Sequence, residues 1–253
     1  MLPQSRSYET LYRDFRWPQP AQFNIGVEVC DRWAERGPDR LAIVAVQPDG
    51  RARKVSYGWL RDTSNRLANA LRAHGIRTGD RVAVLLPQAP EVAAIHVAVY
   101  KIGAIALPLA TLFGVDALSY RLQNSGARAL ITNAPGLDKI APVRDQLPGL
   151  EVVLSTDGPR PDAHGFEQTL ERASSEFTAV ATAADAPALM VYTSGTTGQP
   201  KGIVHDHYVR AMYCSLFANA FRITPESVVL HAGSLVFNGA FVTLMPSWGV
   251  GCA

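Results

Sequence analysis

Short apolar runs alternate with amphipathic segments between residues 82 and 155. The runs lack polar alternation, which is typical of strands that are buried on both faces. The intervening segments carry apolar residues three or four positions apart, which is typical of helices. The expected strands are 82–86, 104–109, 129–132 and 152–155, and the expected helices are 91–102, 115–124 and 137–147. This order predicts an α/β fold of parallel strand–helix layers with right-handed crossovers.

The segment before this repeat predicts a smaller set of elements. Asn24 is placed to cap a helix over 24–35, with Ile25, Val29 and Trp33 on its apolar face. Two strands over 41–46 and 54–56 come next, and then a helix that Ser56 caps and Gly75 ends. Residues 1–22 have no period, and we expect an extended leader packed on the surface.

Residues beyond 155 predict a looser region and then a second group of elements. A short helix is expected over 166–173 and an Ala/Thr-rich linker over 179–186. After the linker, the pattern predicts a strand at 188–191, a helix at 205–221, a strand at 227–232 and a helix at 236–244.

A loop rich in glycine and hydroxyl residues follows the apolar run 188–191. Its glycines let backbone N–H groups approach a ligand closely, its hydroxyls are hydrogen-bond donors, and its lysine adds a mobile positive charge. Such a loop suits a polyphosphate. It is not the commonest phosphate loop, because Gln199-Pro200 separates Gly198 from Lys201. A flexible surface loop is the alternative interpretation.

Residues 191–202 resemble the phosphate-binding signature of the adenylate-forming enzymes, which include acyl-CoA and aryl-CoA synthetases, luciferases and peptide-synthetase adenylation domains. Residues 55–60 and 100–108 resemble two weaker signatures of that family, in the same order. Residues 23–27 most resemble the medium-chain acyl-CoA and acetyl-CoA synthetase branch.

The resemblance implies the large N-terminal domain of an acyl-CoA synthetase, in incomplete form. Residues 23–187 would be the first α/β subdomain, and residues 188–253 the phosphate-loop strand and the start of the second. The family's downstream motifs and C-terminal lid domain have no match before Ala253. We therefore expect the catalytic groups beyond Ala253 and no catalysis by this chain alone.

The resemblance also implies a reaction and a site. ATP would activate a small-molecule carboxylate as an acyl-adenylate, with Mg²⁺, and coenzyme A would then accept the acyl group. The residues expected to hold the β- and γ-phosphates are Thr193, Ser194, Gly195, Thr196, Thr197, Gly198 and Lys201. The candidates for an acyl-pocket wall are His231, Phe237 and Asn238, with His231 expected at the end of a strand.

Two other functions stay open at this point. One is a non-catalytic nucleotide-binding module, and the other is an adenylation domain that loads a carrier protein instead of coenzyme A. The acid is not identified, although the resemblance of residues 23–27 implies a medium-chain or aromatic acid, and a homodimer is possible.

Composition excludes several classes of protein. The net charge of +2, without runs of like charge, gives no reason to expect nucleic acid. The apolar stretch 92–113 is broken by His96, Lys101, Gly103 and Pro108, so we expect no membrane span. Three widely spaced cysteines favour a reducing, cytoplasmic location. We expect all three to be buried as apolar residues.

His205 and His207 flank Asp206 just after the glycine-rich loop. Histidine and aspartate are metal-ligand types, but positions i and i+2 diverge on a helix. We therefore favour a capping or surface role and expect no metal site on the protein.

Overall fold

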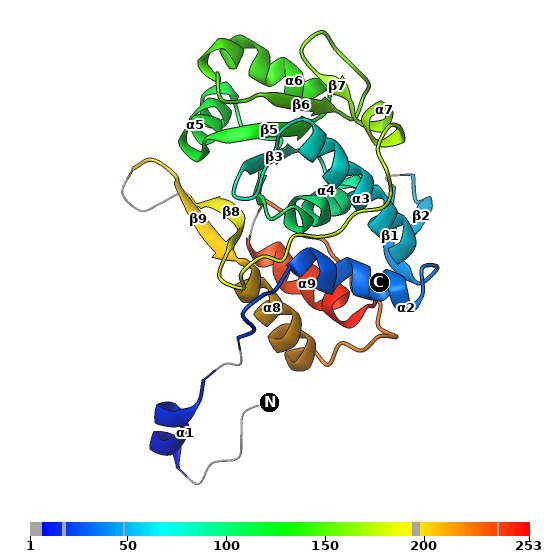
Figure 1. Cartoon of the computed structure of the whole chain (residues 1–253), viewed down its shortest axis with the longest axis vertical. Coiled ribbons are helices and arrows are strands. Elements are labelled where there is room, and N and C mark those ends of the chain that lie inside the picture. Colours follow the sequence, from blue (N-terminus) through cyan, green and yellow to red (C-terminus); the bar gives the residue numbers. More distant parts are fainter. Residues whose placement is uncertain (1–6, 17–18, 48, 194–197, 237) are drawn as a thin grey trace.

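A seven-stranded sheet forms the centre of the computed structural model, which describes residues 7–16, 19–47, 49–193, 198–236 and 238–253. Its strand order is β7-β6-β5-β3-β4-β8-β9 (Figure 1). The bounds are β3 (Arg81–Leu85), β4 (Ile105–Pro108), β5 (Ala127–Thr132), β6 (Val152–Ser155), β7 (His164–Gly165), β8 (Pro187–Thr193) and β9 (Lys201–Asp206). Neighbours are parallel except β8 and β9, which are antiparallel. The α/β prediction is confirmed.

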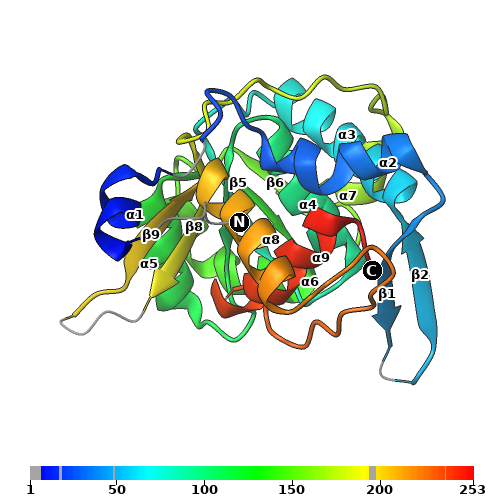
Figure 2. The same cartoon turned by 90° about the horizontal axis from the view of Figure 1, so that it is seen from below.

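Helices cover both faces of the sheet (Figures 1 and 2). One face packs against η1 (Val27–Asp31, a π-helical turn), α2 (Arg32–Arg36), α3 (Tyr57–Ala73), α4 (Pro90–Lys101), α7 (Phe166–Glu171), α8 (His207–Ala220) and α9 (Phe241–Val250). The other packs against α5 (Val115–Ser125), α6 (Ala134–Ile140) and the 3₁₀ turn η2 (Ala141–Gln146). Successive residues of β3 alternate between the two cores, as the pleat requires: Val82 and Val84 face one, Ala83 and Leu85 the other.

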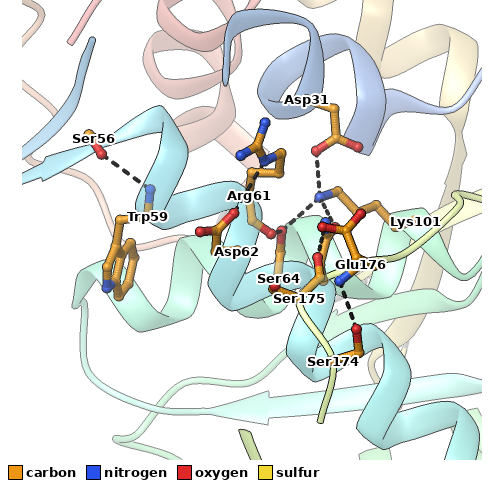
Figure 3. Close-up of polar contacts among 11 residues, drawn as sticks. Asp31, Ser56, Trp59, Arg61, Asp62, Ser64, Lys101, Ser174, Ser175 and Glu176 are labelled. Carbon is orange, nitrogen blue, oxygen red and sulfur yellow. Dashed lines mark hydrogen bonds and ion pairs between the residues drawn. The ribbon is translucent and has the colours of Figure 1, made fainter. Parts of the chain in front are cut away.

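The local signals at the start of the chain act as expected. Ile25, Val29 and Trp33 are buried, and Asn24 Oδ1 accepts from the Gly26 N–H at 3.0 Å. The separate hairpin of β1 (Leu41–Val46) and β2 (Ala52–Ser56) leads into α3. There Ser56 Oγ accepts from the Trp59 N–H at 3.1 Å (Figure 3).

The leader differs from the sequence prediction. Residues Tyr8–Asp14 form α1, which Ser7 caps, instead of extended chain. None of the residues of α1 is buried, and it lies well away from the sheet (Figure 1). Tyr8 and Tyr12 stack on each other at 5.9 Å, so a local aromatic pair supports this helix.

Three predictions near the C-terminus were wrong. Residues 201–206 form β9, so α8 begins at His207 and not at His205. Residues 227–232 form no strand although they are β-prone, and Val228 and Leu230 are exposed because no described strand lies beside them. The expected helix 236–244 is the 3₁₀ turn η3 (Asn238–Ala240) followed by α9, which continues through Pro246.

The side chain of Lys101 is fully buried at the end of α4 and joins four segments (Figure 3). Its Nζ lies 2.5 Å from Asp31 Oδ1 and donates to Ser64 Oγ at 2.9 Å and Asn65 Oδ1 at 2.6 Å. Asn65 Nδ2 donates in turn to the Ser175 carbonyl at 2.8 Å. Burial raises the pKa of Asp31, and the charge of Lys101 opposes that shift. The network therefore holds η1, α3, α4 and the segment after α7 together.

Replacement of Lys101 tests this network. Lys101→Met should lower the free energy of unfolding by about 3–5 kcal/mol, because it leaves a largely buried carboxylate without a counter-charge. Urea denaturation measures the loss. The matched control Lys54→Met, at an exposed position of β2, should stay within about 0.5 kcal/mol of wild type. Adding Asp31→Asn to Lys101→Met should recover part of the loss. Equal stability of Lys101→Met and Lys54→Met would contradict the account.

Candidate functional site

The glycine-rich loop connects β8 to β9 at the carboxyl edge of the parallel strands. Ala106 of β4 pairs with Leu189 of β8, and the β8–β9 register ends at the pair Thr193 and Lys201. The expected phosphate-binding residues Ser194, Gly195, Thr196 and Thr197 lie outside the described residues. The structure thus places Thr193 and Lys201 side by side at the two ends of the loop, and we call this pair the loop mouth. It lies at an edge where open α/β sheets bind ligands.

The sequence of the hairpin explains why its base is firmly held while its mouth is exposed. Leu189 and Val191 are buried in β8. Tyr192 Oη donates to Asn124 Oδ1 at 2.6 Å, and Tyr120 Oη donates to the Pro200 carbonyl at 3.0 Å. Helix α5 therefore fixes both strands next to the loop.

Glycine is required at Gly198, where φ is +136°. A side chain would be strained at that angle, although a Cβ would meet no atom within 4 Å. The backbone beside the loop mouth is therefore open to a ligand as well as left-handed, in keeping with the predicted role of Gly198.

The charge at the loop mouth favours anions. Lys201 is exposed and makes no ion pair with a described residue. Close to the base of the hairpin, the Arg121 guanidinium stacks over Phe113 at 4.1 Å and Tyr192 at 5.5 Å. Burial lowers the pKa of Arg121 and raises the pKa of Tyr192, which leaves the tyrosine neutral. Two cations thus lie near the hairpin without a carboxylate paired to either among the described residues.

A small cavity of about 130 Å³ opens at the same edge of the sheet. It lies where the connections leaving β3 and β5 turn towards opposite faces, the position at which open α/β sheets collect ligands. Its lining residues are Leu85, Pro87, Thr111, Asn133, Pro135, Gly136 and Lys139. The sequence analysis did not identify these residues. The cavity depends on the order of the strands in the sheet, and no local sequence pattern specifies that order.

The acyl-pocket candidates are only partly described. Phe237 lies outside the described residues, and Asn238 begins η3 with its side chain not described. His231 is half-buried in irregular chain and not at a strand end, which corrects the prediction. Its Nδ1 lies 3.0 Å from Thr243 Oγ1 of α9, and burial lowers its pKa. The described contact of His231 is therefore with α9.

The His205-Asp206-His207 stretch has a structural role. Asp206 caps α8, because its Oδ1 accepts from the Val209 N–H at 2.6 Å. His207 is fully buried and not on the surface as expected, and its Nδ1 accepts from the Ile25 N–H at 3.1 Å. Among the described residues, no group of three histidine, cysteine, aspartate or glutamate side chains could hold a metal ion.

Comparison with known proteins decides the family. A family model described as AMP-binding enzyme matches residues 30–253. This chain belongs to the AMP-binding enzyme family. The predicted membership of the adenylate-forming enzymes is thereby confirmed.

Relatives and solved structures of the AMP-binding family agree with this assignment. The chain is 33% identical over 215 residues to acetyl-coenzyme A synthetase of Bacillus subtilis. The alignment covers 80% of this chain and 37% of the relative. It is 31% identical to the 3-hydroxybenzoate/4-hydroxybenzoate–CoA ligase of Thauera aromatica, covering 91% and 46%. The crystal structure of the anthranilate CoA ligase AuaEII with anthranoyl-AMP superposes with a TM-score of 0.83 at 26% identity, covering 92% of this chain and 45% of that one.

Two further facts bound the comparison. The chain spans less than half the length of the two curated relatives named above, 37% and 46%. In addition, none of the helices in the described part of the chain is long and apolar enough to cross a membrane.

Two buried histidines predict a specific dependence of stability on pH. Burial lowers the pKa of His207 to about 4 and that of His96, on α4, to about 3. Both values lie below the ordinary value of about 6.5, so the unfolded chain binds more protons than the folded chain as the pH falls. Their stabilising contribution is complete above pH ~6.5 and declines towards the folded pKa values, by up to roughly 1.4 kcal/mol per pH unit for each histidine.

Urea denaturation between pH 7 and pH 5 measures this slope. His207→Asn, whose amide oxygen can still accept from the Ile25 N–H, should reduce the slope of the unfolding free energy against pH. The reduction should be at most the contribution of one bound proton. Arg172→Asn, which removes no histidine and lies at an exposed position, should leave the slope unchanged. Slopes that are equal in all three proteins would refute the assignment to His207.

Proposed function

We propose that this chain is the N-terminal part of an ATP-dependent acid–CoA ligase, which converts a carboxylic acid to an acyl-adenylate and then to a thioester. The observation that carries the proposal is the hairpin mouth at the carboxyl edge of the sheet, where Thr193 and Lys201 flank the signature loop. Membership of the AMP-binding family and the names of the relatives, acetyl-coenzyme A synthetase and two aromatic-acid CoA ligases, support it.

The proposed chemistry matches what such a loop can supply. A carboxylate is already a nucleophile at neutral pH, so its attack on the α-phosphorus of ATP needs no general base. The difficulty is to bring anions together and to stabilise the charge on departing pyrophosphate. We propose that Thr193, Gly198 and Lys201, with the intervening residues 194–197, bind the β- and γ-phosphates. Bound Mg²⁺ would supply further neutralisation of that charge.

The remaining assignments follow from the same proposal. His231, Phe237 and Asn238 would contribute to the wall of the acyl pocket, and coenzyme A would be the acceptor. The catalytic groups would lie outside this chain, in a cytoplasmic parent enzyme, and a homodimer is an assembly that the proposal allows. The relatives' names favour a small aliphatic or aromatic acid.

ATP binding by the 253-residue chain tests the loop. Lys201→Ala should weaken ATP binding about 10- to 100-fold, because it removes one charge-assisted contact to phosphate. Isothermal titration calorimetry with MgATP measures the change. Lys54→Ala, which removes an equal charge at an exposed position of β2, should bind as wild type does. Equal affinities of the two variants would exclude Lys201 from the phosphate site.

Pyrophosphate exchange tests the division of labour. The 253-residue chain should show no carboxylate-dependent exchange of labelled pyrophosphate into ATP with acetate, hexanoate or benzoate, because the catalytic groups are proposed to lie outside it. Robust exchange with any of these acids would overturn that part of the proposal and leave the ATP site standing.

A further inference from the structure

Arg210, on α8, is buried without a counter-charge. Its side chain is 0% exposed, and Nε, Nη1 and Nη2 are all buried without a hydrogen-bond acceptor in the described part of the protein. A guanidinium carries five N–H donors and stays charged in proteins. Burying such a group with no partner costs several kcal/mol. The position therefore requires a partner that the described residues do not supply.

Aromatic rings cover the guanidinium but cannot satisfy its donors. The Arg210 Cζ atom lies 4.6 Å from the ring centroid of Phe241 and 5.2 Å from that of Tyr213. Cation–π attraction to these rings offsets part of the desolvation cost, by up to about 2 kcal/mol. The electron-rich faces of the rings attract the positive charge, whereas the N–H groups lie in the guanidinium plane and need acceptors there. The hydrogen-bond deficit remains.

The acidic groups of the surrounding elements are engaged elsewhere. Neither α8 nor α9 contains an aspartate or a glutamate. On the packed elements, Glu28 pairs with Arg32 and Asp31 with Lys101, while Glu91 of α4 pairs with Arg53. Asp206 caps the first turn of α8. The charge of Arg210 is thus not neutralised by any described carboxylate.

One uncharged neighbour, His207, increases the surplus of donors. His207 lies one turn before Arg210 on the same face of α8. Because its Nδ1 accepts from the Ile25 N–H, the proton of the neutral ring is on Nε2, which is buried with no described acceptor. His96 Nδ1 lies 3.1 Å from Tyr100 Oη, and its Nε2 is likewise unpartnered. Burial and the nearby Arg210 charge keep His96 neutral by lowering its pKa, and burial raises the pKa of Tyr100.

We propose that Arg210 anchors an internal binding site for one small monovalent anion between α4, α8 and α9. A halide or a single carboxylate group matches one positive charge and a set of N–H donors. The site is separate from the phosphate loop, because the six residues of β9 place Lys201 about 20 Å from His207 at the start of α8. It is therefore additional to the proposed ATP site and does not depend on it.

Thermal unfolding at constant ionic strength tests the site. Sodium gluconate, whose anion is large, is replaced stepwise by chloride, bromide or formate. Wild type should gain roughly 3–5 °C in Tm for each tenfold rise in the free concentration of the anion that binds, once that concentration exceeds the one giving half-saturation. Arg210→Met should lose this dependence, and Arg172→Met, at an exposed position, should keep it. Equal anion dependence in the two variants, or none in wild type, would overturn the proposal.

The choice of anion identifies the source. A stronger effect of formate than of chloride would assign the site to a carboxylate, and the reverse would assign it to an inorganic halide; either result supports the site. If Arg210→Met does not fold, bromide-soaked wild-type crystals decide the question. An anomalous peak within hydrogen-bond distance of the guanidinium confirms the site, and a map without one there refutes it.

Discussion

The buried ammonium of Lys101 is the contact on which the arrangement of one whole face depends. Its side chain binds Asp31, Ser64 and Asn65, and its own carbonyl accepts from the Val180 N–H at 2.8 Å. Segments from four parts of the chain therefore meet at the end of one helix. Gly103 follows with φ of +69° and turns the chain directly into β4. Since β4 is the strand against which β8 pairs, the network also sets the position of the hairpin.

The hairpin shows how a rigid frame can present an accessible loop. The apolar half of β8 is buried in the core, and α5 holds both strands through Tyr120 and Tyr192. The exposed ends at Thr193 and Lys201 then need no stabilisation by further packing. A loop that admits and releases a nucleotide requires this separation of a fixed base from an open mouth.

Sequence patterns predicted the parts of the fold that depend on local chemistry. The strand–helix repeat between residues 82 and 155 could be predicted from the sequence because each element buries its own periodic face. Pairing between distant segments was not readable. The Lys201–Asp206 segment became a strand because β8 lay beside it, whereas the β-prone residues 227–232 found no neighbour and stayed irregular.

The same distinction applies to the sites. Glycines, hydroxyls and a lysine identify the predicted phosphate loop by their own chemistry. Arg210 gives no comparable signal, because an arginine on an amphipathic helix is usually solvated. Only the packing of α9 over α8 reveals that this one is enclosed.

The position of β9 in the sheet has a consequence for handling the protein. Among the described strands β9 is the outermost on its side, and Ile203 and Val204 are 43% and 48% exposed. The outward backbone groups of such a strand are a template on which another chain can add by main-chain hydrogen bonding. The charged residues at its two ends, Lys201 and Asp206, oppose stacking of like copies in register. Concentrated preparations of the isolated chain are nevertheless expected to self-associate along this strand.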